Sequence, residues 1–150
     1  MRLTILFLIF NFGGLAIGGW LMNNGPMTEW YSNLNKASWT PPGYVFGIAW
    51  TLIMISFSIY LGKLFQAENS AKMKLVFLIQ FILNVSWNYI FFNQHLVFVG
   101  LVTIILLTSL LFIYFFNLST KANNYKYLLL PYIIWLCIAT SLNLYILIHN

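Results

Sequence analysis

Long apolar stretches alternate with short polar ones along the whole of the 150-residue chain. An α-helix needs about 20 apolar residues to cross the hydrocarbon core of a bilayer, and each stretch has about that length. The stretches cover residues 3–22, 44–64, 73–93, 97–117 and 127–148. The pattern therefore predicts an all-α membrane protein, a bundle of five transmembrane helices that occupies residues 1–150 as a single domain.

The connections between the predicted helices differ in length and character. Those at 65–72, 94–96 and 118–126 are short, so successive helices are expected to be antiparallel neighbours. The connection 23–43 is long and too aromatic for a solvated linker, since it contains Trp30, Tyr31, Leu34, Trp39, Pro41 and Pro42. We expect it to fold back as a lid over the mouth of the bundle; the alternative is an aromatic belt at the membrane interface.

Composition and charge agree with a membrane protein and orient it. Only 6% of residues are charged, 61% are hydrophobic, and the mean hydropathy is +0.85, which excludes an ordinary soluble domain. Six basic residues lie on the side that holds the N-terminus, and only Lys36 lies on the other; the six are Arg2, Lys63, Lys72, Lys74, Lys121 and Lys126. The positive-inside rule therefore predicts, for a bacterial cell membrane, a cytoplasmic N-terminus and an external C-terminus. These charges form no patch for nucleic acid.

The third predicted helix carries a polar and aromatic stripe. Its members follow the spacing i, i+4, i+7, i+8, i+11, which confines them to one face: Gln80, Asn84, Trp87, Asn88 and Phe91. Amides avoid lipid, so the stripe is expected to face the bundle interior. Asn and Gln often join helices by hydrogen bonds, and that is one interpretation. The accompanying Trp and Phe favour the other, a ligand pocket with polar anchors on apolar walls.

Two further helices present similar faces. The fifth places Tyr132, Trp135, Ala139 and Asn143 together, and the second presents Phe46 and Trp50. Ala139 leaves room either for a neighbouring helix or for a ligand. An aromatic stripe alone is more often packing than pocket. Three inward indoles, Trp50, Trp87 and Trp135, together predict a site for a planar conjugated molecule, because indole rings stack on such molecules and their N–H groups bind polar edges.

A glycine motif in the first helix and the residues before the second helix lead to two further predictions. The first helix contains a GxxxG motif at Gly14 and Gly18, which permits close backbone approach; we favour a homodimer face over packing inside the bundle. Thr40 is expected to be the N-cap of the second helix, with Pro41 at its first position.

Three segments carry a family resemblance. WYSNLNKASWTPPGYVFGIAW (30–50), LNVSWNYIFF (83–92) and PYIIWLCIATSLN (131–143) resemble the TspO/MBR family of tryptophan-rich sensory proteins, which includes the mitochondrial translocator protein or peripheral-type benzodiazepine receptor. The resemblance implies a bacterial-type member, often dimeric, that binds protoporphyrin IX or haem as a ligand and requires no cofactor. It implies lid residues at Tyr31, Trp39, Pro41 and Pro42, and pocket residues at Trp50, Asn84, Trp87, Asn88, Trp135, Ala139 and Asn143.

The chain departs from the family pattern at two places. Ala37 stands where the family usually has proline after the lid lysine, which leaves the loop less constrained. The family's sterol motif pairs a tyrosine with a basic residue, but Tyr145 is followed only by His149 and Asn150, so the motif does not support sterol binding.

The residues favour a receptor or sensor over an enzyme or a transporter. Both acids, Glu29 and Glu68, are in loops, Cys137 lies away from the face of Trp135, and the two histidines are at membrane edges. Conventional acid–base catalysis and a metal site are therefore not expected. One alternative is light-dependent porphyrin breakdown, which the resemblance ties to Trp50 and Trp135. The other is transport of porphyrin or sterol, which would be passive, because ion-coupled transport usually needs charges inside the membrane. The expected partners are an apolar small molecule, the lipid bilayer and a second copy of the chain.

Overall fold

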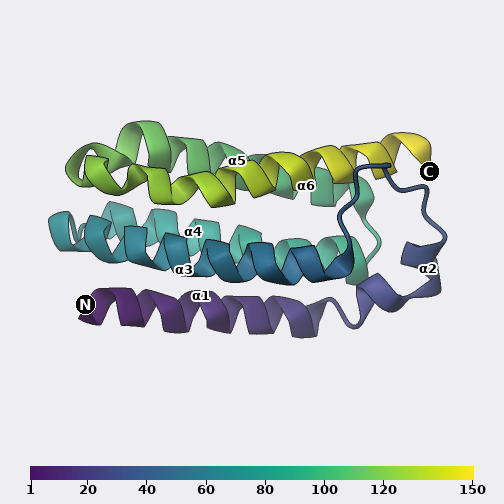
Figure 1. The fold of residues 1–150 in the computed structure, drawn as a ribbon, viewed down its shortest axis with the longest axis horizontal. Helices are drawn as coiled ribbons and strands as arrows, with labels where there is room; N and C mark the ends of the chain where they lie inside the picture. Colours follow the sequence, from purple (N-terminus) through teal and green to yellow (C-terminus); the bar gives the residue numbers. More distant parts are fainter.

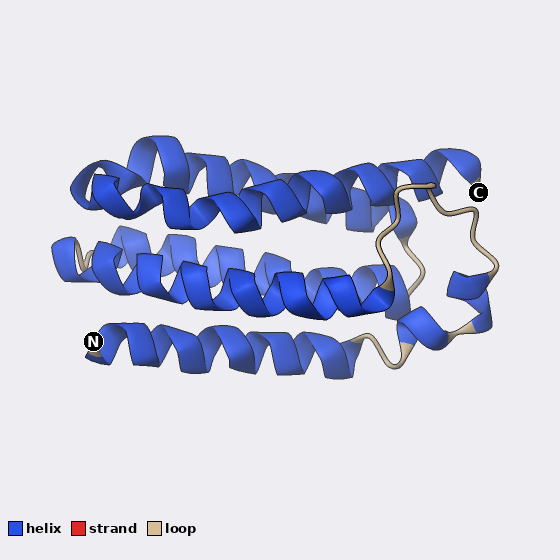
Figure 2. Ribbon diagram, in the orientation of Figure 1, coloured by secondary structure: helices blue, strands red, loops and turns tan.

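Long helices lie side by side along most of the molecule in a computed structural model that describes residues 1–150 (Figures 1 and 2). The elements are α1 (Arg2–Leu21), η1 (Gly25–Met27), α2 (Glu29–Ser32), α3 (Gly43–Ala67), α4 (Ala71–Asn88), η2 (Tyr89–Asn93), α5 (Val97–Ile113), η3 (Tyr114–Leu118), η4 (Ser119–Leu129) and α6 (Leu130–His149). The segments η2 and η3 are single π-helical turns that continue α4 and α5. The termini lie at opposite ends of the bundle (Figure 1).

Four helical runs are long and apolar enough to cross a membrane. The last of them, Val97–His149, spans 53 residues and doubles back at Ala122, where φ is −126° and ψ is 34°. Because of this reversal, α5 and α6 lie side by side and the run supplies two crossings (Figure 1). The expected all-α bundle of five membrane helices is therefore confirmed.

The start of α3 differs from the prediction. The helix begins at Gly43 with Pro42 as N-cap, whereas the Thr40 hydroxyl donates to the Ala37 carbonyl at 2.7 Å instead of capping the helix. The predicted Thr40 cap and Pro41 first position are wrong. The cause is the second proline, because a residue that precedes proline is held in extended conformation and Pro41 precedes Pro42.

The loop 23–43 contains two short helical segments. Asn23 and Asn24 have positive φ values of 49° and 56°, so they turn the chain at the end of α1. The Thr28 hydroxyl oxygen then accepts from the Tyr31 backbone N–H at 3.3 Å, which caps α2. The loop is thus locally ordered by its own polar residues.

The GxxxG motif of α1 packs within the chain. A Cβ at Gly14 would lie 2.7 Å from the Phe81 ring, and one at Gly18 would lie 2.7 Å from the Asn88 amide nitrogen. Both partners are on α4, so the motif brings α1 against α4 instead of forming the favoured homodimer face. Homodimer formation itself stays a prediction.

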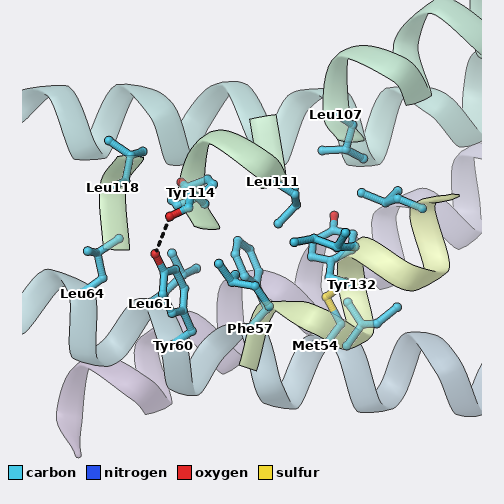
Figure 3. Close-up of a cluster of buried hydrophobic side chains, with 14 of the residues drawn as sticks. Met54, Phe57, Tyr60, Leu61, Leu64, Leu107, Leu111, Tyr114, Leu118 and Tyr132 are labelled. Atoms are coloured by element: carbon cyan, nitrogen blue, oxygen red, sulfur yellow. Dashed lines mark hydrogen bonds between the residues drawn. The ribbon is translucent and has the colours of Figure 1, made fainter. Parts of the chain in front are cut away.

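The tightest packing lies in the half of the bundle near the N-terminus. Large side chains there have no exposed surface, among them Phe57, Tyr60, Leu61, Leu64, Leu111 and Tyr114 (Figure 3). The Tyr60 hydroxyl and the Ser119 hydroxyl share a hydrogen bond of 2.6 Å, so the polar end of this ring is satisfied without water. The other half of the bundle is built differently.

Candidate functional site

A cavity of about 400 Å³ lies between the helices at the end of the bundle where loop 23–43 is located, and residues of this loop line part of it. Its volume falls within the range of about 300–1,000 Å³ that is usual for small-molecule sites. Eighteen residues line it, and eleven of them are hydrophobic. Nine of the predicted site residues are among them: Tyr31, Pro41, Phe46, Trp50, Asn84, Trp87, Asn88, Trp135 and Ala139.

Two predicted lid residues lie outside the cavity wall. Pro42 serves as the N-cap of α3. Trp39 is 54% exposed, and its indole N–H donates to the Ser141 hydroxyl at 3.1 Å while its ring meets the Tyr145 ring edge-on at 5.4 Å. Trp39 therefore fastens the loop to α6.

Three predicted pocket residues lie behind the cavity wall. The Phe91 ring stacks on Trp87, with centroids 5.0 Å apart, and is not part of the cavity wall. The Tyr132 hydroxyl accepts from the Gln80 side-chain amide at 3.0 Å, so this pair joins α4 to α6. Asn143 accepts from the Trp87 indole N–H at 3.2 Å and donates to the Val97 carbonyl at 3.0 Å. These residues support the cavity wall and do not form its surface.

The cavity offers a small set of free polar groups. Asn84 and Asn88 bring side-chain amides from α4, and neither amide pairs with another group of the chain. The indole N–H groups of Trp50 and Trp135 are also unpaired, whereas that of Trp87 is held by Asn143. Two indoles and two amides can therefore bind the polar edges of a ligand.

Edge-to-face contacts fix the indole rings. The Phe46 ring meets Trp135 at 5.1 Å and 89°, and the Tyr132 ring meets Trp50 at 5.9 Å and 73°. Perpendicular contacts of this kind restrain the orientation of the two indoles in the cavity wall. The arrangement suits a flat, conjugated molecule bound among indoles.

Several residues of the cavity wall were not predicted from the sequence. They are Met22, Pro26, Lys36, Thr40, Gly43, Phe92, Ile104, Leu107 and Leu136. Ile104 and Leu107 come from α5, whose nearly uniform apolar sequence gives no stripe that distinguishes an inner face. Lys36 and Thr40 lie in the loop, where no helical period applies.

Contacts at three places fix loop 23–43 at this end of the bundle, and its role as a lid stays a prediction. The Trp30 ring stacks on His95 with centroids 4.0 Å apart. The Asn35 backbone N–H donates to the Asn150 side-chain oxygen at 2.8 Å, and Trp39 is bonded to α6 as described above. Between these points, burial raises the pKa of the Tyr31 phenol above its usual value, so its hydroxyl stays protonated at neutral pH.

Residues with the chemistry for metal binding are not gathered anywhere in the chain. No group of three or more His, Cys, Asp or Glu side chains is placed to hold a metal ion. Cys137 is exposed on α6, away from the cavity wall. The cavity wall presents mainly apolar surface, indoles and amides, together with the Tyr31 phenol and the Lys36 ammonium group of loop 23–43.

Comparison with known proteins agrees with this architecture. Residues 6–149 match the model of the TspO/MBR family. A tryptophan-rich protein TspO of Archaeoglobus fulgidus is 35% identical over 143 residues, which are 91% of each chain. One of Chlorobaculum tepidum is 32% identical over 142 residues, or 91% of this chain and 90% of the relative. A tryptophan-rich sensory protein of Cereibacter sphaeroides is 34% identical over 118 residues, or 77% of this chain and 73% of the relative.

Proposed function

Because the chain belongs to the TspO/MBR family, a family of multi-pass membrane proteins, we propose that it is a receptor for tetrapyrroles such as protoporphyrin IX and haem. The observation that carries the proposal is the cavity beneath loop 23–43, with its two free indole N–H groups and two free amides. A tetrapyrrole has a flat apolar ring and polar groups at its edge, so it matches a cavity with apolar walls and a few free hydrogen-bonding groups. The name of one relative, a sensory protein, supports a sensing role.

The proposal places the loop outside the cell and the N-terminus in the cytoplasm of a bacterium. The end of the bundle opposite the loop holds most of the basic residues, including Lys121, which pairs with Glu68 at 3.4 Å. The cavity then opens towards the outer face. Reporter fusions to the C-terminus test this orientation, and activity only of a cytoplasmic reporter would contradict it.

The binding test is a titration of the purified protein in detergent with protoporphyrin IX, haem and cholesterol. Porphyrin binding is followed by the shift of the porphyrin absorption band, because a fluorescence signal would itself change when a tryptophan is replaced. Trp50→Phe, Trp135→Phe and Asn84→Ala are each expected to weaken porphyrin binding by about threefold to tenfold, since each removes a donor or acceptor in the cavity. Trp20→Phe is the matched control, because Trp20 is 79% exposed on α1.

The outcome of this titration decides the assignment of the site. If all three cavity variants bind protoporphyrin as the parent does, the cavity is not the tetrapyrrole site. Metal-free protoporphyrin is expected to bind at least as well as haem, because no histidine lines the cavity. A histidine-ligated haem spectrum would contradict this part of the proposal.

The position of Trp50 and Trp135 in the cavity wall favours a second candidate, light-dependent breakdown of the bound porphyrin. In that reaction a photoexcited porphyrin, oxygen and a nearby indole react without an acid–base side chain. Illumination of the complex is expected to bleach the absorption band of bound porphyrin faster than that of free porphyrin. The double variant with Trp50→Phe and Trp135→Phe is expected to bleach more slowly than the parent. Equal bleaching of free and bound porphyrin would exclude this activity.

A further inference from the structure

Lys36 is the only charged side chain in the wall of the cavity. The other seventeen lining residues are apolar or carry neutral polar groups such as the Asn84 and Asn88 amides. No helical period points to Lys36, because it lies in loop 23–43 and not on a helix face. Lys36 is half-buried, so water reaches only part of its ammonium group, and an apolar cavity is an unfavourable place for the part of the charge that water does not reach.

The contacts of Lys36 use only part of its hydrogen-bonding capacity. Its ammonium group donates to the Tyr31 carbonyl at 2.7 Å and to the Ser32 carbonyl at 3.3 Å, and it lies 4.7 Å from the centre of the Tyr31 ring. An ammonium group has three N–H donors, so one is left for another acceptor. The two carbonyls hold the group in place at the C-terminal end of α2.

No acidic side chain neutralises Lys36. The chain has two acids, and Glu68 pairs with Lys121 at the opposite end of the bundle. Glu29 is exposed and forms no ion pair with Lys36. The positive charge at the loop end of the cavity therefore has no ion-pair partner, its side-chain contacts are with neutral carbonyls, and it favours an anionic group on a molecule that enters.

We propose that Lys36 binds a carboxylate of the ligand and thereby selects flat apolar molecules that carry an acid group at one edge over neutral ones of the same shape. The inference rests on the proposed tetrapyrrole site and adds a recognition element to it. It also fixes the orientation of the ligand. The carboxylate lies at the loop, next to Lys36, and the ring extends towards Trp50, about two helical turns into α3.

The test compares protoporphyrin IX with its dimethyl ester, which has the same ring and no negative charge. The parent protein is expected to bind the free acid about tenfold more tightly than the ester, the usual scale of a hydrogen bond to a charged group. Lys36→Met is expected to abolish this difference by weakening binding of the acid alone. Lys36→Arg keeps the charge and is expected to retain most of the preference.

A lysine at the other end of the bundle provides the control. Lys126 lies above the Phe115 and Tyr127 rings, far from the cavity lining, and Lys126→Met is expected to leave both affinities unchanged. Raising the salt concentration is expected to weaken binding of the acid and not of the ester, because it screens the charge.

The possible results separate this inference from the proposed function. Equal affinity of the parent protein for acid and ester overturns the role of Lys36 and leaves the tetrapyrrole site standing. Equal weakening of both ligands by Lys36→Met also overturns it, because the lysine then acts only by holding the Tyr31 and Ser32 carbonyls of the loop. Failure of both porphyrins to bind overturns the site and the inference together.

Discussion

Phe46 and Phe57 lie on the same face of α3, eleven residues and about 20° apart, yet their surroundings are opposite. Phe57 has no exposed surface and meets the rings of Tyr60, Tyr114 and Tyr132 (Figure 3). Phe46 is half-buried, packs perpendicular to the Trp135 ring and lines the cavity. One half of the bundle is therefore filled by its own side chains, and the other half leaves space among them.

The polar groups of the two halves differ in the same way. In the filled half, Tyr60 is bonded to Ser119, and Gln80 is bonded to Tyr132. In the half with the cavity, the Asn84 amide and the Trp50 indole N–H have no partner in the chain. The filled half also holds two buried polar atoms without a partner, the Gln80 side-chain oxygen and the Tyr114 hydroxyl, so the contrast rests on the bonds that Tyr60 and Gln80 make across helices. No such bond is made by the Asn84 amide or the Trp50 indole N–H, which stay free for a ligand. The comparison predicts that substitutions in the filled half change stability and those around the cavity change binding.

The largest expected effect is the loss of Phe57. Phe57→Ala removes a fully buried ring and is expected to lower the free energy of unfolding by about 3 kcal/mol. Phe46→Ala on the same helix face is expected to cost less than about 1 kcal/mol, because its ring already borders empty space. Thermal unfolding in detergent measures both. Equal losses would mean that the cavity is as well packed as the core.

A single hydroxyl group provides a smaller test of the same contrast. Tyr60→Phe removes the 2.6 Å hydrogen bond to Ser119 and is expected to cost about 1 kcal/mol of stability with no change in porphyrin affinity. Asn84→Ala removes no internal hydrogen bond, so its melting temperature is expected to match that of the parent while its affinity falls. The reverse pattern, with Asn84→Ala unstable, would identify Asn84 as a structural residue.

The difference between the filled half and the half with the cavity also explains which site residues could be predicted from the sequence. The length of the apolar stretches predicted the five helices, and the helical period predicted the faces that carry Asn84, Trp50 and Trp135. The helical period predicts which face of a helix a residue lies on, but not whether that turn of the helix borders the cavity or the packed core. Tyr132 is on the same face as Trp135 but one turn nearer the filled half, where Gln80 binds it. The hydrogen-bond interpretation of the α4 stripe is therefore confirmed at Gln80, while the ligand-pocket interpretation stays a prediction, which the position of Asn84 in the cavity wall supports.

Other features could not be predicted because they depend on neighbours. Asn143 shares the face of Ala139, but the Trp87 indole and the Val97 carbonyl occupy its amide. Lys36 lies in a loop whose path is set by contacts with α6 and His95. The GxxxG motif showed that Gly18 permits a close approach without showing that the approaching group is the Asn88 side chain.

The approach of Asn88 to Gly18 gives the third prediction. A Cβ at position 18 would lie 2.7 Å from the Asn88 amide nitrogen, so Gly18→Ala is expected to turn this amide and weaken porphyrin binding by about threefold. Gly19→Ala is the matched control, because a Cβ there has no atom within 4 Å. It is expected to leave binding unchanged and to raise stability by up to about 1 kcal/mol through helix propensity. Equal affinities of the two variants would show that Asn88 does not contact the ligand.

The smallest expected change in affinity concerns loop 23–43, whose residues line one end of the cavity. The Asn150 side chain accepts from the Asn35 backbone N–H at 2.8 Å and donates to the Asn35 carbonyl at 3.2 Å. Asn150→Ala removes both bonds, which are exposed and together contribute about 1 kcal/mol to the closed state of the loop. The open state then becomes about fivefold more populated but remains the minority.

Association and dissociation of porphyrin both pass through the open state, so both rate constants are expected to rise about fivefold while their ratio stays within a factor of two. Stopped-flow mixing and ligand displacement measure the two rates. Asn123→Ala, an exposed asparagine at the opposite end of the bundle, is expected to change neither. A faster dissociation without a faster association would mean that Asn150 supports the bound ligand and does not control its entry, and loop 23–43 would then be a fixed wall of the cavity.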